Sequence, residues 1–426
     1  MKTIVINELE NTRVPFLRGI LTRSLLDAGL PFEQAFQVAS KVRDQLSDSA
    51  SITSEELRRR IVVLLEELGD EQALDQYTVP VAAPDRIEVN SLSGIVSAFS
   101  RGRHTRYLQS SGLRAEKAEY TTELIYDQLL ATGVTTITTC QLGYLTYLCL
   151  QQEVSKKAAK RYLVWSEFQR GARPLILLIC GTVGSGKSTV ATEVAHLLEI
   201  VRIQSTDMLR EVMRMLMPKR LLPVLHSSSF NAWKSLPIQD MKGREKDQLV
   251  AEGYRSQVEL LAVPCEAVLQ RAIEECVPLI LEGVHAHPDL LGRLPEDSDA
   301  IMVHVTLAVL KSRELKSRLR GRGVEVPQRR AKRYLNSFNS IWSLQSFLLT
   351  EADRCEVPII THEDKEKTVQ QTIQQVIYEL SKHCKGSARE VFGVVVDEFH
   401  ESAELLSWRE MIPLLSSLPR QLRSTD

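Results

Sequence analysis

The sequence lacks the features that would direct a chain to a membrane or to an oxidising compartment. Its seven cysteines form no C-x-x-C pair and no metal-ligand spacing with histidine, so we expect reduced core cysteines rather than disulfides or a zinc site. The longest apolar run, residues 175–180, is six residues long, whereas a membrane span needs roughly 20. The first residues also lack the hydrophobic region of a signal peptide. These absences predict a cytoplasmic protein with no membrane partner.

An excess of charge of either sign is missing too. Lys and Arg number 53 and Asp and Glu number 54, so the overall charge gives no reason to expect a nucleic-acid partner. Hydrophobic residues make up 43% of the chain and charged residues 25%, which is typical of globular proteins. The length of 426 residues suggests two to four domains of roughly 100–200 residues each. Whether copies of the chain form a homo-oligomer is left open.

An internal repeat occupies the first part of the chain. The segment FLRGILTRSLLDAGL, from Phe16, matches FSRGRHTRYLQSSGL, from Phe99, at a constant offset of 83 residues and with eight of fifteen positions identical. In the second copy, polar residues replace three apolar ones: Arg103 stands for Ile20, His104 for Leu21 and Gln109 for Leu26. The match indicates two related units, and it leaves open whether both have the same ligand.

Both units carry a signal for the start of a helix. The capping box T-x-x-E/Q occurs at residues 53–56 and 138–141, and apolar residues at helical spacing follow the first of these motifs. We predict two mainly α-helical units, each a small helical bundle, over residues 1–90 and 91–170. The boundary between them is expected in the unpatterned stretch 80–92, which contains two prolines.

The pattern changes after residue 173. Short apolar runs rich in Ile, Leu and Val alternate with longer amphipathic segments, which predicts an α/β domain over residues 171–385 with a parallel sheet flanked by helices. The five strand candidates are 175–180, 200–203, 278–282, 300–306 and 357–360. Residues 386–426 form a tail of unknown role, with one apolar run at 391–396 and an acidic helical segment at 398–404.

A phosphate-binding loop follows the first of these strands. GTVGSGKST fits G-x-x-x-x-G-K-[ST] between an apolar strand and a helical pattern. Its glycines let backbone N–H groups close around phosphate oxygens, Lys187 is expected to contact the β- and γ-phosphates, and Ser188 to ligate Mg²⁺. The loop therefore predicts a site for ATP with Mg²⁺. Its binding residues are predicted to be Gly181, Thr182, Gly184, Ser185, Gly186, Lys187, Ser188 and Thr189.

A carboxylate and two arginines follow the second strand candidate. Asp207 lies at an expected helix start, with Arg210 and Arg214 three and seven residues later and therefore on one face. Ligands of open α/β sheets bind at this edge. Asp207 could orient an acceptor hydroxyl, and the arginines could hold an anionic substrate. The alternative is that Asp207 only caps the helix and that the arginines are solvated.

Glu282 ends the third strand candidate in the segment LILEGVH. An unpaired buried carboxylate is costly, so we expect Glu282 to face a cation, either Mg²⁺, directly or through water, or an arginine. His285 follows three residues later. For His285, packing in the core and contact with a ligand both remain open.

Residues 311–333 are strongly basic. They hold ten Lys or Arg, seven of them Arg, against two Glu, and lie where P-loop kinases carry a lid between the fourth and fifth strands. Arginines that close over a triphosphate would stabilise the charge that develops during transfer and exclude water, although a basic run is more often a solvated face. The lid candidates are Arg318, Arg320, Arg322, Arg329 and Arg330, of which we take Arg318 and Arg322 as catalytic candidates.

Residues 221–237 concentrate a histidine, four serines and a tryptophan between prolines. The composition predicts a loop or a broken helix. Hydroxyls and a histidine suit a small polar anion, so His226, Ser228 and Ser229 are candidate substrate residues. A plain surface loop is the alternative.

Together these motifs resemble the 2-phosphoglycerate kinases of the P-loop kinase class over most of the chain. The similar segments are GTxGxGKST, STDxxREVMR, LLPxLHxSSxxAW, ILEGVH and the arginine-rich lid. The two amino-terminal units look like ATP-cone domains. The resemblance implies transfer of the γ-phosphate of MgATP to the hydroxyl of 2-phosphoglycerate, a small anionic substrate, to give 2,3-bisphosphoglycerate. It also implies that Asp207 orients this hydroxyl and that Arg210, Arg214 and His226 hold the phosphate and carboxylate.

Two other functions stay open from the sequence. The acceptor could be another small phosphorylated polyol, such as an inositol phosphate, because only the resemblance identifies it. Alternatively, the chain could sense ATP without phosphorylating a metabolite. As a sensor, it would bind ATP at both the cone-like units and the P-loop. Under the leading kinase hypothesis the cone-like units also meet nucleotide, and the candidates to contact its phosphates are Arg18, Arg23, Arg101 and Arg106.

Overall fold

The structure is a computed structural model that describes residues 3–7, 12–16, 18, 21–22, 25, 30, 32–46, 51–68, 74, 87–91, 94–241, 243–294, 298–325, 331–397 and 407–416. It divides the chain into two compact units, Met1–Arg86 and Ile87–Asp426. The division falls inside the predicted boundary stretch 80–92, most of which lies outside the described residues. Each unit is described by itself.

The first unit combines a small sheet with helices. Its elements are β1 (Ile4–Asn7), β2 (Thr12–Pro15), α2 (Phe32–Gln45), β3 (Ser51–Thr53) and α3 (Ser54–Leu68). The strand order is β2-β1-β3, with β1 antiparallel to β2 and parallel to β3. Apolar faces of the helices form the core, in which Leu25, Ala35, Val42 and Leu65 are fully buried.

The second unit begins with the same arrangement. Its first elements are β4 (Glu88–Asn90), β5 (Val96–Ala98), α5 (Arg101–Ser110), α6 (Ala115–Ala131), β6 (Thr136–Thr138) and α7 (Thr139–Cys149). The order β5-β4-β6 repeats both strand directions of the first unit. A bundle of helices alone is therefore wrong for both copies. Strands of three or four residues are too short to show an alternating pattern.

The predicted helix starts are confirmed. Thr53 Oγ1 accepts a hydrogen bond from the N–H of Glu56 at 3.2 Å. Thr138 and Gln141 form a complete capping box, because each side chain bonds the other residue's N–H, at 3.2 and 2.8 Å. These bonds satisfy N–H groups that a helix start leaves unpaired.

His104 shows how the second copy accommodates its polar substitutions. Its Nδ1 lies 2.9 Å from Thr122 Oγ1 and its Nε2 lies 3.1 Å from Thr146 Oγ1. The equivalent positions of the first unit, at an offset of 83 residues or of 85 after a two-residue insertion, hold the buried apolar residues Leu21, Ala39 and Ile61. A hydrogen-bonded polar triad thus replaces three apolar side chains.

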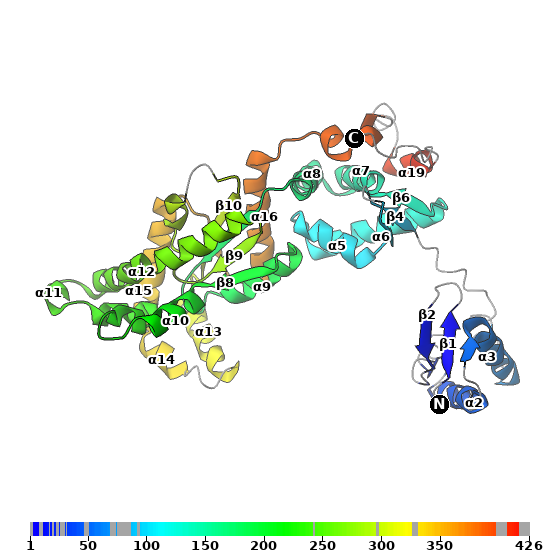
Figure 1. The fold of residues 1–426 in the computed structure, drawn as a ribbon, viewed down its shortest axis with the longest axis horizontal. Coiled ribbons are helices and arrows are strands. Elements are labelled where there is room, and N and C mark those ends of the chain that lie inside the picture. The colour runs from blue at the N-terminus through cyan, green and yellow to red at the C-terminus, as the bar shows by residue number, and fades with distance from the viewer. Residues whose placement is uncertain are drawn as a thin grey trace. The chain divides into compact units, whose positions relative to one another are not determined.

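A five-stranded parallel sheet forms the centre of the second unit (Figure 1). Its strands are β7 (Leu175–Cys180), β8 (Arg202–Ser205), β9 (Leu279–Glu282), β10 (Ile301–Ala308) and β11 (Ile359–Thr361). The order is β11-β10-β7-β9-β8, and every pair is parallel. Each strand lies within two residues of a predicted one, so the α/β fold is confirmed.

Helices cover both faces of this sheet. α8 (Lys156–Arg170), α9 (Lys187–Leu197) and α16 (Lys365–His383) pack on the face that carries Leu177 and Ile179. α12 (Lys246–Glu274) packs on the face of Ile176 and Leu178, and α15 (Phe338–Arg354) packs against α12. Because successive residues of β7 face opposite helical layers, the whole strand is apolar.

The remaining described helices form two groups, those that follow strands β8, β9 and β10 along the chain and those that pack on the second copy of the repeat. The first group is α10 (Thr206–Leu216), η2 (Pro223–His226), η3 (Ser229–Ser235), α11 (Ile238–Met241), η4 (Leu290–Arg293), α13 (Ser312–Glu325) and α14 (Ala331–Asn336). The second group is η1 (Leu150–Val154), α17 (Ala388–Phe392) and α19 (Trp408–Ser416). The two short turns η2 and η3 confirm the predicted broken helix in residues 221–237.

The carboxyl-terminal tail packs on the second copy of the repeat. Figure 1 shows α19 beside α7, and Phe392 and Trp408 are buried in the core that α5, α6 and α7 form. The indole N–H of Trp408 donates to Glu153 at 3.0 Å, and its backbone N–H donates to Gln152 at 3.0 Å. The predicted acidic segment 398–404 lies outside the described residues.

The structure bears on two predictions, the absence of a membrane span and the burial of the cysteines. Within the described part of the chain, no helix combines the length and apolarity that a membrane span requires. Cys149, Cys180 and Cys265 are buried as expected. Cys276 is exposed, so the prediction that all cysteines are core residues is wrong at this position, where the chain turns with a positive φ of 51°.

Candidate active site

The order of the strands determines where the candidate active site lies. From β7 the chain moves to β8 at one side and returns through β9, and it then crosses to β10 and β11 on the other side. The chain therefore continues first on one side of β7 and then on the other, and such a switch point opens a crevice at the carboxyl ends of parallel strands. The P-loop follows β7, and all other candidate groups follow β8, β9, β10 or β11 at this same edge.

The P-loop, residues 181–189, is tightly held between α13 and the end of β11. Gly184 and Gly186 both have a φ of +87°, a left-handed conformation that favours glycine. A Cβ on Gly186 would lie 2.2 Å from the ring of His362, and a Cβ on Gly184 would lie 2.9 Å from Leu315. Conformation and space therefore both require glycine at these two positions.

The loop offers several groups that suit a phosphate. The first N–H groups of α9 have no partner within the helix and form the positive end of its dipole. The Nζ of Lys187 donates to the carbonyl of Thr182 at 3.1 Å, and the lysine side chain is nearly buried. Among the described residues, the buried hydroxyl of Thr182 has no hydrogen-bond partner. This arrangement can cradle an anion.

Ser188 and Glu282, the two predicted metal ligands, are brought together. The hydroxyl of Ser188 donates to Glu282 Oε1 at 3.0 Å, and Glu282 is 7% exposed at the end of β9. Hard oxygen donors are the ligands that Mg²⁺ prefers, and adjacent ligands of an octahedron with Mg–O bonds of 2.0–2.1 Å lie about 3 Å apart. The donor set and its spacing therefore fit Mg²⁺ completed by water or phosphate oxygens.

Asp207 lies in the first turn of α10 but does not cap it. The cap is Ser205, whose Oγ accepts from the N–H of Asp207 at 3.2 Å. The Asp207 side chain is 63% exposed, and its Oδ1 lies 3.6 Å from a terminal nitrogen of Arg210. The capping alternative is therefore wrong, and the carboxylate is available to an incoming hydroxyl.

A buried hydrogen-bond network joins β9 to α10. Arg210 and Gln257 both donate to the carbonyl of Ser227, at 3.0 and 2.9 Å, and Gln257 also donates to Val224 at 2.6 Å. These bonds use the amide hydrogens of Gln257, so its oxygen accepts from Nε2 of His285 at 3.0 Å. The protonated nitrogen of His285 is therefore Nε2, and Nδ1 carries a lone pair.

His285 lies at the meeting point of the P-loop and α10. Burial lowers the pKa of His285 to about 3. The nearby charge of Asp207 raises this pKa, and the charges of Arg210 and Lys187 lower it. Its Nδ1 is buried and has no hydrogen-bond partner within the described part of the chain. His285 is thus a neutral acceptor of hydrogen bonds beside three charged candidates.

The other predicted substrate residues mainly contact groups near them. Arg214 forms two hydrogen bonds with Glu211, at 2.7 and 2.8 Å. His226 Nε2 bonds the carbonyl of Met217 at 2.9 Å, which ties the end of α10 to η2. Ser228 accepts a weak contact from Arg333 at 3.4 Å, and Ser229 is buried. Of the predicted set, Asp207 and Arg210 are the pair that lies side by side, and Arg210 shares the carbonyl of Ser227 with the residue that bonds His285.

The lid candidates lie mostly beyond what the structure describes. Arg329, Arg330 and the side chain of Arg322 fall outside the described positions. Arg320 is exposed on α13. Arg318 is half-buried, and one terminal nitrogen donates to Glu314 at 2.7 Å and to the carbonyl of His362 at 2.7 Å. In this structure Arg318 therefore supports the segment after β11.

His362 is a site residue that the sequence prediction missed. Its Nδ1 lies 2.7 Å from the carbonyl of Ser185 in the P-loop, and since a carbonyl only accepts, Nδ1 carries the hydrogen. Burial lowers the pKa of His362 below its usual value, so the ring is neutral near pH 7. A polar residue directly after the fifth strand candidate was the available signal, because the carboxyl ends of parallel strands meet at one edge.

The arginines proposed for the cone-like units have local partners. The Arg18 guanidinium lies 4.3 Å from the centre of the Phe36 ring. Arg101 bonds Glu123 at 3.0 Å, and this partner raises the pKa of the Arg101 guanidinium. Arg106 is half-buried, and Arg23 lies outside the described residues.

Known proteins resemble this chain along most of their own length. The 2-phosphoglycerate kinase of Pyrococcus horikoshii is 33% identical over 289 residues, which cover 68% of this chain and 92% of that protein. The 2-phosphoglycerate kinase of Pyrococcus furiosus is 35% identical over 280 residues, which cover 66% of this chain and 89% of that protein. The 2-phosphoglycerate kinase of Methanopyrus kandleri is 33% identical over 285 residues, which cover 67% of this chain and 85% of that protein. No protein-family model matches. The aligned stretches are longer than residues 171–385, so the similarity extends beyond the α/β domain.

Proposed function

Because the chain belongs to the 2-phosphoglycerate kinase family, we propose that it transfers the γ-phosphate of ATP to the free hydroxyl of 2-phosphoglycerate. It is a phosphotransferase with an alcohol group as acceptor. The new bond joins the acceptor oxygen to the γ-phosphorus, the bond from this phosphorus to the bridging oxygen of ADP breaks, and the hydroxyl proton is released. The products are 2,3-bisphosphoglycerate and ADP.

In this proposal the P-loop holds the triphosphate. The N–H groups at the start of α9 bind phosphate oxygens, and Lys187 leaves the carbonyl of Thr182 to contact the β- and γ-phosphates. Ser188 and Glu282 would hold Mg²⁺, which neutralises phosphate charge when it is bound. A cytoplasmic location belongs to the same proposal.

The observation that carries the acceptor side is that Asp207 lies 3.6 Å from Arg210, whose hydrogen bond to Ser227 belongs to the network that reaches His285 after β9. Asp207 accepts a hydrogen bond from the acceptor hydroxyl and orients its oxygen toward the γ-phosphorus. Arg210 binds an anionic group of the substrate, with Arg214 and His226 as further candidates. Phosphoryl transfer needs mainly positioning and charge stabilisation, and lid arginines can add the latter.

The direct test uses the full chain with MgATP and 2-phosphoglycerate. Formation of 2,3-bisphosphoglycerate, followed by phosphorus NMR, is the expected result. Turnover of an inositol phosphate with no turnover of 2-phosphoglycerate would overturn the acceptor but keep the kinase. Failure with every acceptor in a broad screen with labelled ATP would favour an ATP sensor, in which the cone-like units and the P-loop bind nucleotide without transfer.

Replacing Asp207 with asparagine separates a kinase from a sensor. The side chain is exposed, so Asp207→Asn should fold, keep its affinity for ATP and lose about 10²–10⁴-fold in kcat, because positioned general bases contribute this much. Asp299→Asn is a matched control, since this exposed aspartate precedes β10 at the opposite edge of the sheet. Full activity of Asp207→Asn would contradict the role of this carboxylate.

A further inference from the structure

Apart from the crevice at the P-loop, a cavity lies between α8, α16 and the edge strand β11. It has a volume of about 600 Å³ and is lined by described residues of all three elements. Lys187 and the other P-loop residues are not among them. Ligand pockets commonly enclose about 300–1,000 Å³, so this cavity is large enough for a small metabolite.

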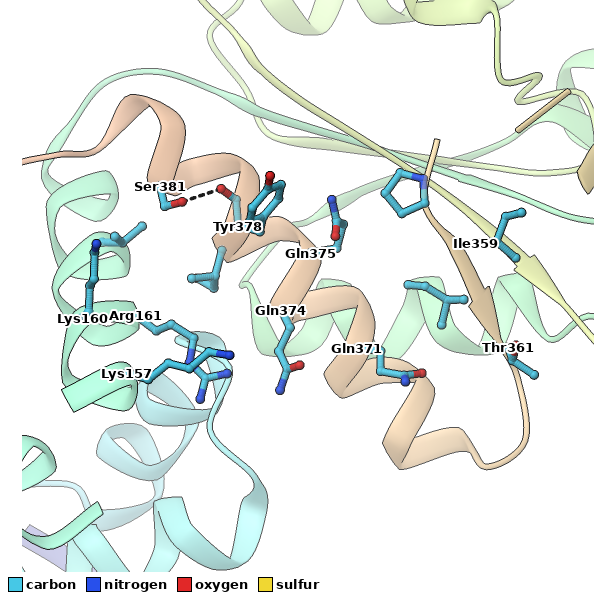
Figure 2. Close-up of a pocket in the computed structure, with 14 residues that line it drawn as sticks. Lys157, Lys160, Arg161, Ile359, Thr361, Gln371, Gln374, Gln375, Tyr378 and Ser381 are labelled. Atoms are coloured by element: carbon cyan, nitrogen blue, oxygen red, sulfur yellow. Dashed lines mark hydrogen bonds between the residues drawn. The ribbon is translucent and has the colours of Figure 1, made fainter. Parts of the chain in front are cut away.

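One wall of the cavity is positively charged. Lys157, Lys160 and Arg161 line it from α8, and their spacing of three and four residues places them on one face of the helix. Figure 2 shows Lys157 and Arg161 pointing from α8 toward Gln374 on α16. None of the lining residues is an aspartate or a glutamate. The lining therefore has three positive charges and no negative one.

Arg161 is the most constrained of these cations. Its Nε is buried and has no hydrogen-bond partner among the described residues, and burial lowers the pKa of its guanidinium. Gly112, with a φ of +86°, lies beside this side chain: a Cβ there would be at ordinary contact distance, 3.6 Å from Arg161 and 3.5 Å from Gln374. A partly desolvated guanidinium is costly unless an anion pairs with it.

The facing wall carries uncharged hydrogen-bonding groups. Gln371, Gln374, Gln375 and Tyr378 line the cavity from successive turns of α16, at the spacing of one helix face. Amides and a phenol can donate to phosphate oxygens, and they can donate to or accept from hydroxyl groups. Ile360 and other apolar residues complete the lining, which suits the carbon skeleton of a small molecule.

We propose that this cavity binds a small metabolite that carries two or more phosphate groups. Each phosphate monoester has a charge of about −1.5 to −2 at pH 7, so two of them match three cations better than one does. A ligand in this cavity would contact α8, a helix that packs in two different cores. Ala158 and Ala159 pack in the core of the second repeat, whereas Val164 and Trp165 pack against the sheet, and the ligand would join this shared helix to α16.

Lysine acetylation with mass spectrometry tests the site directly, with sodium tripolyphosphate as the probe. Lys157 and Lys160 are exposed, so both should react without probe. At a probe concentration ten times the Kd, their acetylation should fall about tenfold, because only the free site reacts. Lys156 is exposed on the same helix but does not line the cavity, and its acetylation should not change.

Two comparisons separate this site from the P-loop and from general charge. Protection must persist in Lys187→Ala, which weakens phosphate binding at the P-loop. Calorimetry in that background should show that Lys157→Ala/Lys160→Ala loses binding, whereas Lys156→Ala/Lys117→Ala, with the same change of charge, keeps it. Loss of protection in Lys187→Ala, equal protection of Lys156, or equal protection by inorganic phosphate at the same concentration would overturn the proposal.

Discussion

One side chain outside the P-loop contacts the loop directly. His362 donates to the carbonyl of Ser185 and fills the space beside Gly186. Replacing it with alanine should raise the KM for ATP about fivefold, because a net hydrogen bond contributes about 1 kcal/mol and tenfold in affinity corresponds to about 1.4 kcal/mol. The KM for the acceptor should change little. Steady-state kinetics with each substrate varied in turn gives both values.

The conservative variant distinguishes support of the loop from simple packing. In His362→Asn the amide nitrogen can take the place of Nδ1, so this variant should keep most of the affinity for ATP. His383→Ala, at an exposed position in the last turn of α16, serves as a control. Equal increases in both KM values for His362→Ala would show that the residue has no specific effect on the P-loop.

At the scale of elements, the polar triad in the second repeat behaves as one unit. Thr146 donates to the carbonyl of Leu142 at 2.7 Å, so its oxygen accepts from Nε2 of His104, and Nδ1 accepts from Thr122. Thr146→Ile alone should cost about 1–3 kcal/mol, because it leaves the Nε2 hydrogen without an acceptor. His104→Leu/Thr122→Ala/Thr146→Ile should return to within about 1 kcal/mol of the native chain.

The apolar counterpart in the first unit supports this expectation. Leu21, Ala39 and Ile61 are all buried there, so the same fold accepts an apolar set at these positions. The measurement is chemical denaturation followed by tryptophan fluorescence, since Trp408 lies in the same core as the second repeat. Additive losses in the triple variant would contradict coupling within the triad.

For the molecule as a whole, stability should fall as the pH drops below about 6.5. Burial lowers the pKa of His104 to about 4, of His285 to about 3 and of His304 to about 4. Their unfolded pKa is about 6.5, so between this value and the folded pKa the unfolded chain binds protons that the folded chain does not. At pH 5 each histidine should cost about 2 kcal/mol of unfolding free energy relative to pH 7.5.

Thermal unfolding at several pH values checks this slope. The triad variant that lacks His104 should lose at most about one third of the pH dependence, because His285 and His304 remain, as do His287 and His362, whose pKa values burial also lowers. An identical midpoint at pH 5 and pH 7.5 would show that these rings do not stay neutral in the folded protein.

Local sequence patterns correctly predicted the features that depend only on residues close together in the chain. Capping boxes need only residues three apart, and buried parallel strands show as continuous apolar runs. The strands of the repeats, three or four residues long, had no such signal, and the tail gave no sign that Trp408 would pack on the second repeat. Contacts over more than two hundred residues depend on shape and not on spacing.

The sequence by itself determined that the chain contains a P-loop, a five-stranded parallel sheet and a duplicated amino-terminal unit, because periodicity and glycine conformation act within a few residues. Only the tertiary structure decided which side chains surround the P-loop. It brought His362 to Ser185, Glu282 to Ser188 and His285 to Gln257, since the strand order, and not distance along the chain, sets which loops meet at one edge of the sheet.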